Sequence, residues 1–283
     1  MLTLNHVSYS YYKRAEVIHD ISASVGPGIH LLLGANEAGK TTLLHLMSGM
    51  RFPTSGTCEF NGTPLRERRP EDLCAVQLLD DNTRFPAKTI AEMEKIHSPF
   101  FPSFDHDMLI SNMERFGLKM DTPLARMSLG TVRKAHLAYM LSLRCNTLLL
   151  DEPTNGLDIS AKQTLNRMIL ECVSEEQTVI VSTHTVADLE MLYDSVMVIR
   201  QGWLILNMPI SEITRRIAFI TADTPTHDAV YFEPMFNQSR CIIPNPDGII
   251  ESKLDFTLLY NGLMSSSANT ILSLLSQKPY IMI

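Results

Sequence analysis

The sequence predicts an α/β fold with a doubly wound core sheet, and three features support this prediction. Short apolar runs that suit buried parallel strands recur at residues 29–33, 147–150, 178–182 and 196–199. Helical patterns separate these runs at residues 40–50, 159–173 and 186–192. A glycine-containing loop at residues 34–39 joins the first apolar run to the first helix. Strands and helices that alternate in this way form a parallel sheet with right-handed crossovers.

Three further parts are expected around this core. An N-terminal antiparallel β subdomain is predicted from strand patterns at residues 2–10 and 17–25, and two more strands are expected at 57–60 and 73–77. A helical insert spans about residues 78–145, with helices at 90–97, 105–116 and 130–145. One domain is therefore predicted at residues 1–217. Residues 218–283 form a small C-terminal accessory region, with a candidate strand at 230–232 and a candidate helix at 270–275.

Composition limits the classes of function. The formal net charge of −7 argues against nucleic acid as a partner, because such proteins usually carry a basic domain. The five cysteines form no CxxC pair, which argues against a disulfide framework or a zinc site and favours a reducing compartment. All apolar runs are far shorter than the roughly 18 residues that a membrane helix needs. Any membrane role is therefore expected to depend on a separate partner.

The loop after the first core strand matches the phosphate-binding pattern GxxxxGK[ST], in the strand-loop-helix context that this pattern requires. Its glycines let successive N–H groups point at phosphate oxygens, and the helix N-terminus adds a favourable dipole. Lys40 is expected to contact the β- and γ-phosphates, and the Thr41 hydroxyl is expected to bind Mg²⁺. The predicted nucleotide-binding residues of this segment are Gly34, Ala35, Asn36, Glu37, Ala38, Gly39, Lys40, Thr41 and Thr42.

Two adjacent acids, Asp151 and Glu152, follow the apolar run at residues 147–150. In open α/β sheets, ligands bind outside the carboxyl ends of the strands. A carboxylate at a buried strand end is costly without a partner, so Mg²⁺ is the expected partner of Asp151. Glu152 is then free to orient or deprotonate an attacking water molecule.

The run from Asp151 to Asp158, Asp-Glu-Pro-Thr-Asn-Gly-Leu-Asp, resembles the joined Walker B motif and D-loop of ABC ATPases. This resemblance covers residues 1–216 and implies roles for further residues. Gln77 would be the Q-loop glutamine that serves Mg²⁺, and His184 the switch histidine that holds the γ-phosphate. Tyr11 would stack on adenine, with Tyr9 and Tyr12 as the alternatives.

A signature motif is expected at the start of the last helix of the insert. The family usually has Leu-Ser-Gly-Gly-Gln there, whereas this chain has Met127-Ser-Leu-Gly-Thr131. Ser128 and Gly130 are kept, and the resemblance implies that they contact the γ-phosphate in the opposing subunit. The Ser-Leu-Gly form is similar to signatures of exporter subunits. Glu37 also departs from the family pattern, and its side chain is expected to point to solvent.

The resemblance implies an ATP-binding and ATP-hydrolysing subunit of an ABC transporter, peripheral on the cytoplasmic face of the cell membrane. The implied partners are a multi-spanning membrane permease, contacted through the helical insert and Gln77, and a second ATP-binding subunit, identical or different. ATP would drive the dimerisation. One alternative is an ABC-type ATPase outside transport, although no sustained heptads mark a long coiled coil. Another is a nucleotide-sensing regulatory module without turnover, against which the presence of Glu152 argues.

Overall fold

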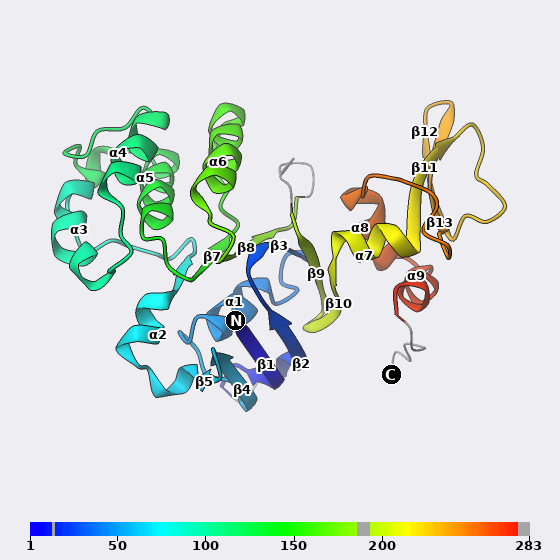
Figure 1. The fold of residues 1–283 in the computed structure, drawn as a ribbon, viewed down its shortest axis with the longest axis horizontal. Helices are drawn as coiled ribbons and strands as arrows, with labels where there is room; N and C mark the ends of the chain where they lie inside the picture. The colour runs from blue at the N-terminus through cyan, green and yellow to red at the C-terminus, as the bar shows by residue number, and fades with distance from the viewer. Residues whose placement is uncertain (13–14, 186–192, 277–283) are drawn as a thin grey trace. The chain divides into compact units, whose positions relative to one another are not determined.

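The computed structural model describes residues 1–12, 15–185 and 193–276 of the chain (Figure 1). The chain divides into two compact units. The first unit holds Met1–Tyr193 and Ile199–Ile205, and the C-terminal unit holds Asp194–Val198 and Leu206–Ile283. None of the helices within the described residues combines the length and apolarity that a membrane crossing requires.

The core is a six-stranded sheet with the order β10-β9-β3-β8-β7-β6. Its strands are β3 (Gly28–Leu33), β6 (Val76–Leu79), β7 (Thr147–Asp151), β8 (Thr178–Thr183), β9 (Ser195–Arg200) and β10 (Trp203–Pro209). Strands β3, β8, β7 and β6 pair in parallel, and β7 and β8 are buried along their whole length. Parallel strands covered on both faces are continuously apolar, which is why the sequence predicted them. The predicted α/β class is confirmed.

A second, four-stranded sheet has the order β2-β1-β4-β5. It consists of β1 (Leu2–Ser10), β2 (Glu16–Val25), β4 (Ser55–Phe60) and β5 (Thr63–Pro64), paired antiparallel as expected. Helix α1 (Lys40–Met47) contacts β7 of the core and also β2 and β4 of this sheet. Every residue of α1 except Thr41 is buried, so packing from both sheets fixes the helix that follows the loop.

The helical insert contains three α-helices, α3 (Ile90–His97), α4 (His106–Arg115) and α5 (Leu129–Ser142). They gather at one end of the first unit in Figure 1, and α4 packs on α5. Short 3₁₀ turns punctuate this region and the preceding segment, as η1 (Leu65–Glu67), η2 (Ser98–Phe100) and η3 (Leu124–Arg126). Helix α6 (Ile159–Cys172) follows β7 as predicted. The predicted helix at 186–192 lies outside the described residues.

One predicted strand is wrong. Residues 73–77 were expected to be extended, but helix α2 (Pro70–Ala75) occupies most of this range and β6 begins only at Val76. Pro70 stands at the first helical position, where its missing N–H costs nothing, and two acids follow in the first turn. This start signal outweighs the apolar run that suggested a strand.

The C-terminal unit contains a small antiparallel sheet with the order β11-β13-β12. Its elements are α7 (Ile210–Arg216), β11 (Ile217–Ala222), β12 (Tyr231–Met235), β13 (Gln238–Pro244), α8 (Phe256–Met264) and α9 (Ala268–Leu275). Helix α8 contacts β12, β13 and α9. The strand at 230–232 and the helix at 270–275 were anticipated, whereas β11, β13 and α8 were not. Helix α7 belongs to the C-terminal unit.

We expect a chain that ends at Pro209 to keep its ability to bind ATP. The phosphate-binding loop and both candidate acids lie in the first unit, and β10 ends at this residue. Equilibrium binding of a fluorescent ATP analogue should give an affinity close to that of the full chain, with circular dichroism as the check on folding. A folded shortened chain that fails to bind would show that the C-terminal unit completes the site.

Candidate functional site

A cavity of about 420 Å³ opens at the carboxyl ends of the core strands. Its walls come from the loop after β3, the start of α1 and the segments that follow β6, β7 and β8. This is where open α/β sheets place their ligands. The lining residues are Val17, Asn36, Glu37, Gly39, Lys40, Thr41, Thr42, Asp81, Glu152, Asn155 and His184. Three of the predicted binding residues, Gly34, Ala35 and Ala38, belong to the same loop without lining this cavity.

Two glycines of the loop are required by their surroundings. A Cβ on Gly34 would lie 2.7 Å from Cγ2 of Ile199, and Gly39 adopts a φ of 107°, which disfavours any side chain. The Lys40 ammonium donates to the carbonyls of Gly34 and Ala35 at 2.8 and 3.2 Å. Because the side chain is only 6% exposed, the loop holds this positive charge at the floor of the cavity. Glu37 is exposed, as expected for a side chain directed to solvent.

Asp151 is buried, and two hydroxyls satisfy its carboxylate. Thr41 donates its Oγ1 hydrogen to Oδ2 at 2.5 Å, and the fully buried Ser182 donates to Oδ1. Burying a carboxylate is costly unless its oxygens are hydrogen-bonded. The strand end, the start of α1 and the end of β8 are therefore tied together at one carboxylate.

Glu152 lies next to this cluster and has one unsatisfied oxygen. Its Oε1 is 3.2 Å from Lys40 Nζ and 2.9 Å from His184 Nδ1. Its Oε2 is buried and has no hydrogen-bond partner among the described residues. The backbone of Glu152 has a φ of 45°, a left-handed conformation that is strained for a residue with a side chain. Glu152 lines the cavity, so its carboxylate lies beside the buried Lys40 ammonium at the place where a phosphate would be bound.

The structure does not bring Gln77 to the cavity. Gln77 lies inside β6, and its Nε2 donates to the carbonyls of Leu73 and Val76 at 2.5 and 3.2 Å. Because α2 occupies residues 70–75, the strand is shifted towards the C-terminus and ends at Leu79. Asp81, two residues beyond that end, lines the cavity in its place. The predicted metal-binding role of Gln77 is therefore not supported by its position.

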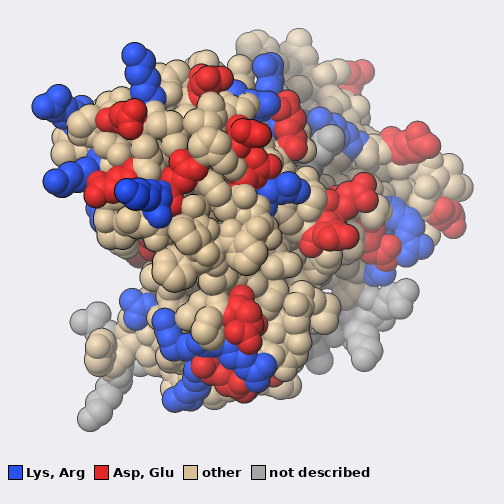
Figure 2. All heavy atoms as spheres, turned by 60° about the vertical axis from the view of Figure 1, so that its left-hand side comes forward, with Lys and Arg blue, Asp and Glu red and all other residues tan. Residues whose placement is uncertain are grey.

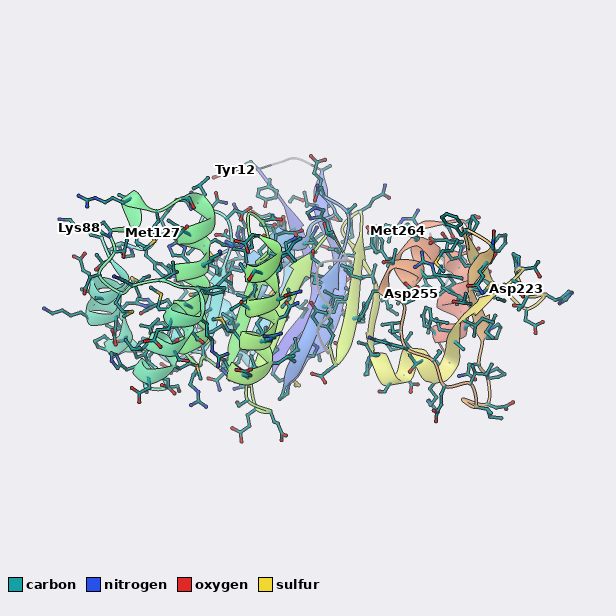
Figure 3. The ribbon with its side chains drawn as sticks, turned by 90° about the horizontal axis from the view of Figure 1, so that it is seen from above. Tyr12, Lys88, Met127, Asp223, Asp255 and Met264 are labelled. Carbon is teal, nitrogen blue, oxygen red and sulfur yellow. The ribbon has the colours of Figure 1, made fainter. Side chains whose placement is uncertain are left out.

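Tyr11 is engaged in contacts of its own. Its hydroxyl is 3.0 Å from Thr42 Oγ1, the Arg51 guanidinium lies 4.8 Å from its ring centroid, and Tyr9 packs edge-on against it. Tyr12 is instead 95% exposed and adopts a φ of 36°. Figure 3 shows Tyr12 at the edge of the first unit, where β1 has just ended. Of the three tyrosines, Tyr12 has the ring that is available for stacking on a base.

Ser128 and Gly130 are not part of this cavity. Ser128 is exposed and caps α5, where its Oγ accepts from the Thr131 N–H at 3.2 Å (Met127, just before it, is labelled in Figure 3). A Cβ on Gly130 would lie 2.6 Å from the carbonyl oxygen of Gly156, so only glycine fits there. Leu129, between them, is 88% exposed. The two halves of the predicted phosphate site are thus separate within one chain.

The chain is similar in sequence and in fold to several known proteins. The family model described as ABC transporter matches residues 18–155. An ABC transporter ATP-binding protein of Caldanaerobacter subterraneus is 32% identical over 209 residues, which are 66% of this chain and 81% of that protein. A lantibiotic transport ATP-binding protein of Streptococcus pyogenes is 28% identical over 209 residues, 73% of this chain and 90% of that protein. A dimeric ATP-binding cassette solved with ADP and Pi shares the fold, with a TM-score of 0.62 at 15% identity over 74% of this chain and 98% of that one.

Replacing Tyr12 by Ala is expected to weaken ATP binding, because stacking of a base on an aromatic ring is worth about 1–3 kcal/mol. Tyr11→Phe removes only the contact with Thr42 and should bind ATP almost as the wild type does. Equilibrium titration with a fluorescent ATP analogue measures both variants. If Tyr12→Ala binds ATP as tightly as the wild type, then Tyr12 does not stack on the base and Tyr11 or Tyr9 is the candidate.

Proposed function

Because this chain belongs to the family of ABC transporter ATP-binding proteins, we propose that it hydrolyses MgATP in the cavity above Lys40 to drive a separate membrane subunit. The observation that carries this proposal is the Glu152 carboxylate, whose Oε1 contacts Lys40 and His184 while its buried Oε2 stays unpaired. A phosphate-binding loop alone would support binding. A carboxylate at the wall of the same cavity, 3.2 Å from Lys40 Nζ, supports turnover as well.

The residues present fit a bound Mg²⁺. Thr41 Oγ1 and Asp151 Oδ2 are 2.5 Å apart at the cavity, and a hydroxyl with a carboxylate is the hard-oxygen donor set that this ion takes beside nucleotide phosphates. Thr41 and Asp151 would hold the ion. Mg²⁺ neutralises charge on the phosphates when it is bound. Asp81, on the cavity wall, supplies a further carboxylate where Gln77 was expected.

Each side chain of the cavity has a distinct task in this proposal. Lys40 holds the β- and γ-phosphates by charge, because its ammonium is fixed at the floor of the loop. His184 orients the Glu152 carboxylate and contacts the γ-phosphate. The Glu152 carboxylate, at the wall of the cavity, positions the attacking water and accepts its proton. Catalysis then consists mainly of positioning and electrostatic stabilisation.

The functional unit is proposed to be a dimer of ATP-binding subunits, either two copies or two different chains. Ser128 and Gly130 lie outside the cavity of their own chain, so a second chain would present them to the γ-phosphate. Exposed apolar side chains at the starts of α5 and α6 support such an interface, since Leu129 is 88% and Ile159 78% exposed. The similar cassette with ADP and Pi is described as dimeric.

The membrane partner is proposed to be a multi-spanning permease that docks on the helical insert and keeps the chain on the cytoplasmic face. Figure 2 shows that the insert carries Lys and Arg interspersed with Asp and Glu, which favours a protein partner over nucleic acid on this face. Export is the proposed direction. The Ser-Leu-Gly form of the signature supports it.

Glu152→Gln should keep ATP binding and slow turnover by about 10²–10⁴, the usual contribution of a positioned base. The amide retains the shape of the side chain but loses its basicity. Equilibrium ATP binding is measured beside phosphate release, with the exposed Glu175→Gln as the matched control. Turnover at the wild-type rate in Glu152→Gln would contradict the proposed role.

ATP should convert the Glu152→Gln variant from monomer to dimer. Blocked hydrolysis preserves the γ-phosphate that joins the two halves of the site. Light scattering with and without ATP measures the molar mass. Adding Ser128→Glu should abolish the dimer while leaving ATP binding to the single chain intact, because a carboxylate there would repel the phosphate. A dimer that persists in the double variant would exclude Ser128 from the interface.

A further inference from the structure

We propose that Arg133 is a positioning residue that holds the backbone of Glu152 in its left-handed conformation and so aims the carboxylate at the reacting water. This inference rests on the proposed role of Glu152 in hydrolysis. Arg133 lies in the second turn of α5, the helix that begins beside Ser128, and it is only 8% exposed.

The guanidinium of Arg133 donates hydrogen bonds to the main chain at the ends of β6 and β7. One terminal nitrogen, Nη1, donates to the carbonyl of Asp80 at 2.9 Å. The other, Nη2, donates to the carbonyls of Asp151 and Glu152 at 2.6 and 3.2 Å. The carboxylate of Asp81, which lines the cavity, is 3.6 Å from Nη1. A single side chain therefore connects helix α5 with the segments after β6 and β7, which supply Asp81 and Glu152 to the cavity.

Burying the charged guanidinium of Arg133 costs free energy, which a purely structural contact at this place would not require. Burial lowers the pKa of Arg133, although the nearby acids Asp81 and Asp151 oppose that shift. Its Nε is buried and has no partner among the described residues. The hydrogen bonds of the guanidinium go to main-chain carbonyls, and the Asp81 carboxylate 3.6 Å away offsets part of its charge. The arginine guanidinium is planar and holds its donors in fixed directions, so it can reach three carbonyls at once. A lysine ammonium does this less well.

The main-chain N–H and carbonyl of Glu152 are both held by hydrogen bonds. The N–H donates to Ser182 Oγ at 3.0 Å, and the carbonyl accepts from Arg133 at 3.2 Å. Between these two contacts the residue keeps a φ of 45°, which a side chain disfavours. The same carbonyl also accepts from the Asn155 N–H at 3.1 Å, so loss of Arg133 removes one of the two donors that fix it. With one donor left, the residue can relax towards an ordinary conformation. That rotation would carry the carboxylate away from Lys40 and His184.

Steady-state kinetics of the full-length chain test this inference. Arg133→Gln should lower kcat by about ten-fold, the usual value of a hydrogen bond to a charged group, with little change in KM or in the equilibrium affinity for ATP. Arg133→Lys should recover part of the rate, and thermal unfolding checks that each variant is folded. The matched control is Arg115→Gln on α4, whose arginine is partly exposed and pairs with Glu171, and it should behave as the wild type.

A double-mutant cycle separates positioning from a general structural effect. Because Arg133 acts through Glu152, Arg133→Gln combined with Glu152→Gln should be no slower than Glu152→Gln alone. The inference would be overturned if the fold-losses in kcat of the two single variants multiply in the double variant. It would also be overturned if Arg133→Gln has the kcat of the wild type. If Arg133→Gln does not fold, Arg133→Lys takes its place in the cycle with the same criteria. Full turnover in Glu152→Gln alone would instead overturn the proposed function of Glu152, so the two failures are distinguishable.

Discussion

Asp151 carries a carboxylate that is 6% exposed at the end of β7, and the need to satisfy that buried charge organises the site around it. Thr41 and Ser182 provide the two hydroxyl donors, one from the start of α1 and one from β8. The same Ser182 oxygen accepts from the Glu152 N–H. The phosphate-binding loop, the hydrolytic acid and the end of β8 thereby have fixed relative positions. The sheet supplies the framework, since parallel strands bring their carboxyl ends to one edge.

Two buried cations, Lys40 and Arg133, lie beside the acids at the end of β7. Lys40 is held by the loop carbonyls within reach of Glu152, which in turn contacts His184. Arg133 donates to the main-chain carbonyls of Asp151 and Glu152. Lys40 from the phosphate-binding loop and Arg133 from α5 thus both lie close to the two acids. The chemistry at the cavity and the helix that would meet a second subunit share a direct connection, which offers a route for coupling between them.

The sequence predicted the parts of the site that local patterns encode. The phosphate-binding loop and the paired acids are short motifs bounded by apolar runs, and both lie where they were expected. Gln77 was misplaced because residues 73–77 are apolar enough to suit a strand, although Pro70 and the acids after it start a helix.

The remaining features depend on residues that are distant in sequence. The Tyr12 ring is available for stacking on a base, whereas the Tyr11 ring is not, because the Arg51 guanidinium lies against it. In the C-terminal unit, Arg240 pairs with Glu233 across β12 and β13, and such polar residues obscured the alternation that marks strands. Arg133 has no local signal, because its contacts all depend on tertiary structure.

A crystal structure of the Glu152→Gln chain with ATP and Mg²⁺ tests the central claim most directly. The account predicts β- and γ-phosphates against the loop at residues 34–41, with Lys40 Nζ on them and the ion between the Thr41 hydroxyl and the Asp151 carboxylate. It also predicts Ser128 and Gly130 of a second copy at the γ-phosphate. Phosphates bound away from this loop, or an ion that contacts neither Thr41 nor Asp151, would contradict the account.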